Sequence, residues 1–204
     1  VLPPRSAGCR EWSRWNPQIT GLAYTPDGAT LIVVGEGLAA YDAVNQRPLW
    51  CVDAADPEYF FGIWAMSPDG RTIATLNKLS VLETRRVADG ALLQQWTTPI
   101  SYPFSSDLTF TPDGRGLVLP GNDRQILLWS LGGSDNPRVL VESPASVESV
   151  AFSPDGQTLA VATIDSAISL WNTTTWTVEK TWINERFSSD PQLVFSPDGQ
   201  TLAI

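Results

Sequence analysis

The sequence contains no histidine, only two cysteines, and only two lysines among its 13 basic residues. Without histidine there is no Ser-His-Asp triad, no histidine general base and no histidine-ligated zinc site. Two cysteines, Cys9 and Cys51, are too few for a cysteine-rich zinc site or a disulfide framework. They allow one bridge or two separate thiols, and separate thiols are the more common outcome. We therefore expect neither a metal site nor a cofactor.

Positive charge and long apolar runs are scarce as well. The formal net charge is −9, and the only adjacent basic pair is Arg85-Arg86, so nucleic acid is not an expected partner. No stretch approaches the roughly 18 consecutive apolar residues of a membrane span. Ser6-Ala7-Gly8-Cys9 has a weak similarity to a lipoprotein cleavage site, which leaves lipidation of Cys9 as a minor alternative. Hydrophobic residues still make up 43% of the chain, enough to build a core.

The tetrapeptide (Ser/Thr)-Pro-Asp-Gly recurs five times. Its prolines are Pro26, Pro68, Pro112, Pro154 and Pro197, so the spacings are 42, 44, 42 and 43 residues. A period of about 40–45 residues is that of a four-stranded propeller blade. Proline presets φ at the second position of a turn, aspartate suits the third, and glycine accepts the left-handed conformation that follows. The tetrapeptide therefore predicts one such hairpin turn in each blade.

Apolar residues at fixed distances from the proline predict the first two strands of each blade. Four residues before it stand Leu22, Trp64, Leu108, Val150 and Leu193, and two before it stand Tyr24, Met66, Phe110, Phe152 and Phe195. A strand that is apolar on both faces is buried on both faces, as the innermost strand of a blade should be. The second strand opens five residues after the proline, at Leu31, Ile73, Leu117, Leu159 and Leu202.

Two further strands follow in each period. Asp123-x-x-Ile126-x-Leu128-Trp129 and Asp165-x-x-Ile168-x-Leu170-Trp171 share one template for the third strand, each tryptophan standing 17 residues after its proline. Weaker versions are Leu38, Ala40 and Tyr41 in the first repeat, and Leu79, Val81 and Leu82 in the second. Fourth strands are expected at 48–51, 91–96, 138–141 and 176–182.

These elements predict an all-β fold, a β-propeller of four-stranded blades with four complete blades and the start of a fifth. The expected blade limits are about 19–60, 61–104, 105–146, 147–189 and, partial, 190–204, after an irregular N-terminal segment at 1–18. Open strand edges are costly. We therefore expect either that the chain is a piece of a longer propeller, the favoured alternative, or that the N-terminal segment or another chain pairs with the open edge.

The sequence Phe-Ser-Pro-Asp-Gly-x-Thr-Leu-Ala at 152–160 and 195–203, with the Asp-x-x-Ile-x-Leu-Trp template, resembles the WD-repeat family in a form common among its bacterial members. The resemblance covers about residues 19–204 and implies a toroidal platform for assembling other proteins. Two features depart from the family. Its Gly-His dipeptide is absent, and the aspartate of its Trp-Asp pair survives only as Asp42, with Ser130 and Asn172 elsewhere. We expect Asp123 and Asp165 to bond instead to amides of their own turns.

Carboxylates are the candidates for chemistry. The turn aspartates recur with the repeat and are expected to be structural. Asp107 and Asp190 each end a Phe-Ser-Ser-Asp segment before an innermost strand, near the expected channel mouth. Two carboxylates in a channel suit acid–base hydrolysis, but recurrence of the segment favours a structural role. The closest sequences to a calcium loop, at 53–56 and 133–136, lack its Asp-x-Asp-x-Asp-Gly pattern and are expected to be surface loops.

Aromatic residues divide into two groups. Trp50, Trp96, Trp129, Trp171 and Trp182 fall on expected strands and predict packing between blades. The other group lies in the connections that lead into innermost strands, where loops on a rigid scaffold present binding residues. The predicted partner-binding residues are Tyr59, Phe60, Phe61, Tyr102, Phe104, Arg186 and Phe187.

The leading hypothesis is a non-enzymatic scaffold whose inter-blade loops bind a protein or peptide. An alternative is a regulatory or sensor module of a larger polypeptide. A third, from the enzyme class, is a hydrolase that uses Asp107 and Asp190.

Overall fold

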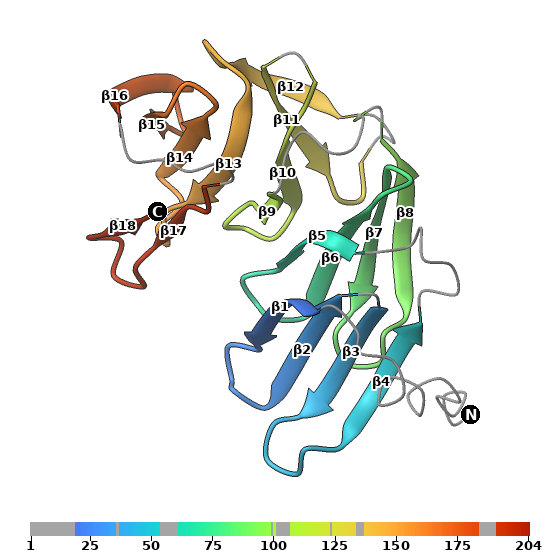
Figure 1. The fold of residues 1–204 in the computed structure, drawn as a ribbon. Helices are drawn as coiled ribbons and strands as arrows, with labels where there is room; N and C mark the ends of the chain where they lie inside the picture. The colour runs from blue at the N-terminus through green and yellow to red at the C-terminus, as the bar shows by residue number, and fades with distance from the viewer. Residues whose placement is uncertain are drawn as a thin grey trace. The chain divides into compact units, whose positions relative to one another are not determined.

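The computed structural model describes residues 19–35, 37–53, 61–98, 100, 107–122, 124–133, 137–183 and 191–204. Their regular elements are β-strands (Figure 1). These strands form four four-stranded antiparallel sheets and one two-stranded sheet. In every four-stranded sheet consecutive strands are neighbours. The predicted all-β fold, with four blades and the start of a fifth, is confirmed.

The strands of the first two blades lie in one compact unit, residues 1–99. Blade 1 consists of β1 (Ile19–Tyr24), β2 (Thr30–Gly35), β3 (Gly37–Asp42) and β4 (Pro48–Asp53). Blade 2 consists of β5 (Phe61–Met66), β6 (Thr72–Asn77), β7 (Val81–Arg86) and β8 (Leu92–Thr97).

The remaining strands lie in a second compact unit, residues 100–204. Blade 3 consists of β9 (Thr109–Phe110), β10 (Gly116–Pro120), β11 (Gln125–Ser130) and β12 (Arg138–Glu142). Blade 4 consists of β13 (Val147–Phe152), β14 (Thr158–Thr163), β15 (Ala167–Asn172) and β16 (Thr177–Ile183). The fifth repeat contributes the hairpin of β17 (Val194–Phe195) and β18 (Leu202–Ala203).

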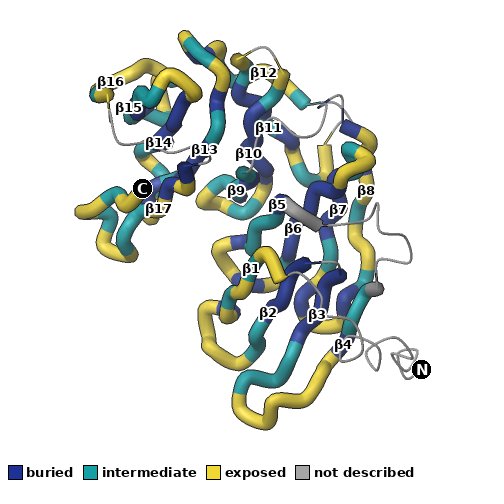
Figure 2. The backbone as a smooth tube through the Cα atoms, viewed as in Figure 1, coloured by how far each residue is buried: buried dark blue, intermediate teal, exposed yellow. Residues whose placement is uncertain are grey.

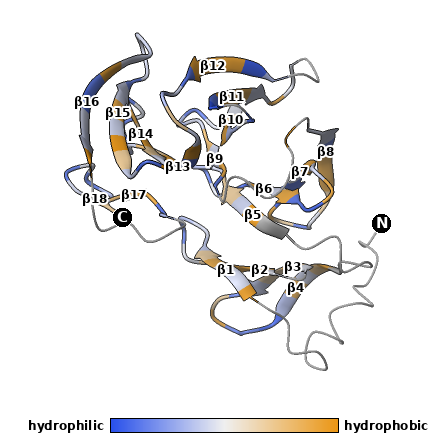
Figure 3. Cartoon of the chain, turned by 45° about the horizontal axis from the view of Figure 1, so that its top comes forward, coloured by the Kyte–Doolittle hydropathy of each residue, from blue (hydrophilic) through white to orange (hydrophobic). Residues whose placement is uncertain are grey.

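The core of each unit lies between neighbouring blades and is built on their second strands. Figure 2 shows β2, β6, β10 and β14 as largely buried. In the first unit Ile32 and Val34 of blade 1 cluster with Ile73 of blade 2. In the second, Val118 and Ile126 of blade 3 cluster with residues of blade 4. By contrast, the outer strand β16 carries hydrophilic stretches and is exposed along most of its length (Figure 3).

The prediction that innermost strands are buried on both faces is wrong for β1. Leu108, Val150 and Leu193 are 2–6% exposed, whereas Leu22 is 59% and Tyr24 is 60% exposed. The physical reason is whether a preceding blade packs against the strand. β5 and β13 each pack against the preceding blade, and among the described residues no strand precedes β1.

The third strand of blade 2 also differs from the prediction. Leu79 lies in the turn before β7 and is 44% exposed. The residue that pairs with Ile73 is Arg85, just as Trp129 pairs with Leu117 and Trp171 with Leu159. An arginine therefore occupies the tryptophan position of the repeat.

Four of the five strand tryptophans are buried as predicted, with Trp50, Trp96, Trp129 and Trp171 between 0% and 7% exposed. For the fifth, Trp182, packing between blades stays a prediction. This tryptophan is only half-buried on the outer strand β16, where the ammonium of Lys180 lies 5.6 Å from its ring centre.

Cys51 lies on β4 and is disulfide-bonded, so the expectation of separate thiols is wrong for this residue. Chain spacing does not fix the distance between two Cα atoms, which decides whether a bridge forms. Cys9 lies outside the described residues. Within the described ranges, no helix has the length and apolar character needed to cross a membrane.

Candidate functional site

The predicted partner-binding residues fall in three connections between blades. Tyr59, Phe60, Tyr102, Phe104, Arg186 and Phe187 lie outside the described residues, and Phe61 is described only as the first backbone position of β5, paired with Asn77. The strands on either side are described: β4 and β5, β8 and β9, and β16 and β17. This partner-binding site therefore stays a prediction. Its residues fall in sequence between strands that the structure describes.

The five (Ser/Thr)-Pro-Asp-Gly turns share one hydrogen-bond network. In each, the hydroxyl donates to the aspartate Oδ1 at 2.6 Å, and the amide two residues after the aspartate donates to the same oxygen at 3.0 Å. The hydroxyl oxygen accepts the amide that opens the next strand. The glycine of every turn has a φ of 68–71°. The predicted structural role of these aspartates is confirmed.

These hydrogen bonds stabilise the charged form of the aspartates. The bond from the Thr25 hydroxyl, followed by that from the Ala29 amide, lowers the pKa of Asp27 below its usual value. The pKa values of Asp69, Asp113, Asp155 and Asp198 are lowered in the same way. In all five turns the bond from the hydroxyl falls on Oδ1 of the aspartate.

Two further acidic positions of the repeat also cap turns. Asp165 accepts the Thr163 hydroxyl at 2.6 Å and the Ala167 amide at 3.4 Å, which confirms that it bonds within its own turn. Asp42 accepts the amides of Val44 and Asn45 at 2.9 and 2.8 Å. Asp123 lies outside the described residues.

Asp107, the hydrolase candidate, is held by neighbouring inner strands. Its Oδ1 accepts the Leu108 amide at 3.0 Å, and its Oδ2 accepts the Ser149 hydroxyl at 2.6 Å and the Val150 amide at 3.4 Å. Ser149 is fully buried, and its hydroxyl oxygen accepts the Leu193 amide at 3.0 Å. This chain of bonds joins three successive repeats and gives Asp107 a structural task. Asp190 lies outside the described residues.

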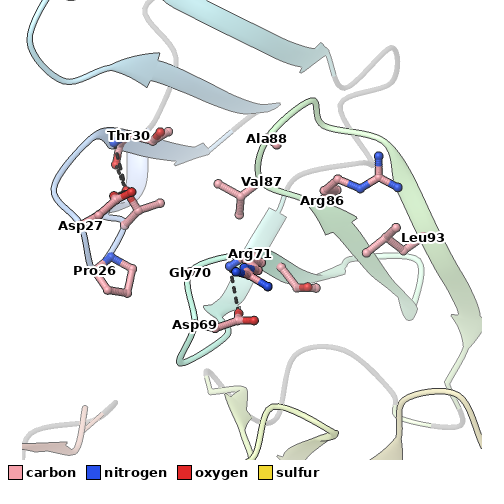
Figure 4. A pocket seen from close by; sticks show the side chains of 12 residues that line it. Pro26, Asp27, Thr30, Asp69, Gly70, Arg71, Arg86, Val87, Ala88 and Leu93 are labelled. Carbon is pink, nitrogen blue, oxygen red and sulfur yellow. Dashed lines mark hydrogen bonds between the residues drawn. The ribbon is translucent and has the colours of Figure 1, made fainter.

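A cavity of about 660 Å³ lies between the turns of blades 1 and 2, and Figure 4 shows its lining. Pro26 and Asp27 contribute from blade 1, and Arg71, Arg86 and Leu93 from blade 2. Each arginine has a carboxylate near it. Arg86 donates to Asp89 at 2.9 Å, and the charge of Arg71 contributes to the low pKa of Asp69. The lining of this cavity therefore carries both cations, Arg71 and Arg86, and carboxylates, Asp27 and Asp69.

A second cavity, of about 390 Å³, occupies the same place in the repeat between blades 3 and 4. Pro112 and Asp113 replace Pro26 and Asp27, and Asp155 and Gly156 replace Asp69 and Gly70. Its chemistry is different, because the half-buried rings of Phe152 and Trp176 line it. Neither cavity is predictable from a single repeat, since each is assembled from two repeats. Trp176 was expected on the fourth strand, but it lies in the turn before β16.

The proline of one turn packs on the glycine of the next, close to these cavities. A Cβ on Gly70 would lie 2.3 Å from Cδ of Pro26, and one on Gly156 would lie 2.6 Å from Cγ of Pro112. Only glycine fits at such distances without movement of the proline ring. Within the described residues, no group of three acidic, cysteine or histidine side chains is arranged to hold a metal ion.

Comparison with known proteins connects this fold to a family. Residues 136–172 match the family model "WD domain, G-beta repeat". Protein HIR1 of Mycosarcoma maydis is 31% identical over 85 residues, which is 42% of this chain and 8% of that protein. The chain thus spans less than a tenth of that relative's length. Since the curated relatives are eukaryotic, the similarity to bacterial members stays a prediction.

Solved structures share the fold. The β-propeller domain of Myceliophteria thermophila Cps50 (Swd1) superposes with a TM-score of 0.74 at 12% identity, over 92% of this chain and 62% of that chain. Kuenenia stuttgartiensis hydrazine synthase gives a TM-score of 0.74 at 18% identity, over 91% of this chain and 55% of that chain. At such identities the likeness concerns the fold and carries no activity.

Proposed function

We propose that this β-propeller, whose residues 136–172 match the WD-repeat family model, is a non-enzymatic scaffold that binds a protein or peptide through the loops between its blades. Proteins of this family generally act as protein-interaction platforms. The observation that supports the proposal is that the strands on either side of these aromatic sequence positions belong to hydrogen-bonded sheets. Loops held by a rigid scaffold are where binding residues concentrate, and aromatic side chains are frequent interface anchors.

Chemical crosslinking at the loops tests the proposal. A photoreactive benzoylphenylalanine at Tyr59 or Tyr102 should crosslink to a defined partner in extract of the source cells. The control position is Val44, which is 83% exposed in the turn at the opposite end of β4. Equal crosslinking from Val44, or none from the loop positions, contradicts the proposal.

Alanine variants separate binding from folding. Replacing Tyr59, Phe60, Tyr102 and Phe104 with alanine should weaken capture of the crosslinked partner and leave the Tm unchanged, because loop side chains add little to the sheets. Unchanged capture, or loss of the fold, contradicts the assigned role of these residues.

The second candidate function is a regulatory module of a larger polypeptide. It is favoured by the relative sizes, because this chain matches only 8% of HIR1 and 14% of the Medicago truncatula cell cycle switch protein ccs52B. Here the crosslinks from Tyr59 and Tyr102 should join the loops to another part of the same polypeptide instead of a separate partner.

A further inference from the structure

Trp176 has a backbone conformation that disfavours tryptophan. Its φ is 55°, in the left-handed region where a bulky residue is a genuine outlier. The same turn position is Gln46 in blade 1 and Gly90 in blade 2, where the amide also donates four residues back, to Asp42 and Arg86. Blade 4 thus places a large aromatic residue where the repeat accepts glycine. Local strain of this kind is frequent at functional sites.

The indole of Trp176 lines the 390 Å³ cavity, together with Phe152, Leu128 and Pro112. Trp176, Phe152 and Leu128 are partly buried against the core of blades 3 and 4, so the aromatic wall is fixed from behind. Small-molecule sites occupy about 300–1,000 Å³. This cavity is at the low end of that range, which suits a short segment of peptide.

The charge at the rim is negative on the blade 4 side. Asp113 has the cation of Arg115 near it, which helps to lower its pKa. For Asp155 the bonds from the Ser153 hydroxyl and the Gln157 amide are the causes of the lowered pKa, and no cation contributes. Both bonds fall on Oδ1. The cavity lining carries the carboxylates of Asp113 and Asp155 and the cation of Arg115, so a further cation beside Asp155 would meet an excess of negative charge, and the net charge of −9 attracts basic segments at longer range.

We propose that this cavity binds a proline-rich peptide segment that carries a basic residue, with prolyl rings against Trp176 and Phe152 and the arginine or lysine against Asp155. Aromatic-lined grooves are the usual receptors of polyproline II segments, whose preformed helix loses little conformational entropy on binding. A neighbouring carboxylate then selects for the basic residue. The proposal rests on the interaction role proposed above, but it names a different site and a ligand class.

Calorimetric titration with a blocked peptide, Ac-Ala-Pro-Pro-Pro-Arg-Pro-Pro-Pro-Ala-NH2, tests the proposal. Two matched peptides replace arginine with glutamate, or the prolines with alanine. We expect measurable binding of the parent peptide, weaker binding of the glutamate peptide, and the weakest binding of the alanine peptide, which lacks the prolyl rings. Absence of binding by the parent at millimolar concentration, or equal binding of the glutamate peptide, overturns the proposal.

Variants of the chain locate the site. Trp176→Gln carries the residue that blade 1 has at this position and should weaken binding roughly thirtyfold, as loss of an aromatic anchor does. Asp155→Asn keeps an acceptor for its turn and should weaken binding about twofold to fivefold, since the pair is exposed. Asp198→Asn is the matched control in the fifth repeat and should change nothing. Undiminished binding by Trp176→Gln overturns the proposal, and Asp155→Asn remains informative if that variant folds poorly.

The two proposals fail separately. The alanine variant of Tyr59, Phe60, Tyr102 and Phe104 should bind the proline peptide like the wild type. If the peptide does not bind but the loop variant loses its partner, the scaffold role stands and the cavity proposal falls. If the peptide binds and the loops have no effect on any partner, the loop proposal falls alone.

Discussion

The interface between blades 1 and 2 and the interface between blades 3 and 4 have the same strand register. The large aromatic side chain in the interface comes from the preceding blade in the first case and from the following blade in the second. In the first, the aromatic group comes from the outer strand of the preceding blade. Trp50 of β4 packs on Gly90 and donates its Nε1 hydrogen to the Val87 carbonyl at 2.6 Å. The third strand of blade 2 carries Arg85 instead, paired at 2.8 Å with Glu83, whose side chain is 6% exposed.

Between blades 3 and 4 the aromatic group comes from the third strand. Trp171 of β15 packs on Val118 and Ile126 and donates to Ser169 at 2.8 Å. The outer-strand position that matches Trp50 is the exposed Arg138, since Ala40 pairs with Trp50 and Leu128 with Arg138. In both blades a donor at the tryptophan position bonds to a residue two places earlier on the same strand face. Blades 2 and 4 therefore share the geometry of this bond, although the chemistry of the two bonded groups differs.

The largest expected effect comes from breaking the charged version of this bond. Glu83→Ala leaves the Arg85 guanidinium, 15% exposed, without its carboxylate partner and should lower the free energy of unfolding by about 3 kcal/mol. Ser169→Ala removes the hydrogen bond that Trp171 donates to the Ser169 hydroxyl and should lower the free energy of unfolding by about 1 kcal/mol. Urea denaturation of both variants measures the difference.

A control for charge alone is the exposed pair of Arg86 and Asp89, with side chains 52% and 38% exposed. Asp89→Ala should cost less than about 1 kcal/mol. If Glu83→Ala costs no more than that variant, the pair in blade 2 is not equivalent to a buried contact and the comparison fails.

The second effect concerns the room that Trp50 needs. A Cβ on Gly90 would lie 2.6 Å from the Trp50 ring, and φ is 70°. Gly28 has the same conformation, with φ of 69°, but nothing lies within 4 Å of its Cβ direction. Gly28→Ala should lower the free energy of unfolding by about 1 kcal/mol, because alanine disfavours the left-handed conformation. Gly90→Ala should lower it by about 2–3 kcal/mol, because the added methyl group also overpacks against Trp50. Equal shifts in the urea midpoint of the two variants would show that Trp50 moves aside freely.

The smallest effect is a dependence on pH. Hydrogen bonds in the folded state lower the pKa values of the turn aspartates. Near the usual aspartate pKa of about 3.9, the unfolded chain therefore binds more protons than the folded chain. Stability from these turns is therefore present above about pH 4 and is lost as pH falls through the folded-state pKa values. Thermal unfolding from pH 7 to 3 should show a constant Tm that declines only at the acidic end.

Carboxyl titration by NMR sharpens the comparison between blades 3 and 4. Arg115→Gln should raise the pKa of Asp113, which feels the arginine charge, and leave that of Asp155 unchanged. A shift at Asp155 would mean that the arginine spans both turns.

The period, the turns and the strand order were predictable because each depends on residues close together in sequence. Proline, aspartate and glycine specify the turn by their own conformational preferences, and the flanking apolar residues then fix the register. Arg85 was missed although it stands 17 residues after Pro68, since a charged residue did not fit the apolar template. Glu83, two residues earlier on the same face of the strand, was the available indication.

Features that depend on two repeats could not be predicted in the same way. Exposure of Leu22 and Tyr24 reflects what packs against β1 and not the composition of β1. The cavities arise where the turn of one blade meets the turns of the next, so no single period contains their lining. The aromatic loop residues were named from sequence, and their role stays a prediction.

The stacking of a proline on the glycine of the following turn gives the array a direction. Pro26 covers Gly70, Pro112 covers Gly156, and Cδ of Pro154 lies 3.5 Å from the Cβ direction of Gly199. In these three pairs, the proline ring of one turn fills the space beside the glycine of the following turn. Duplication or deletion of whole periods would keep this contact between proline and glycine. Insertion or deletion of any other length would separate the proline ring from the glycine that it packs on.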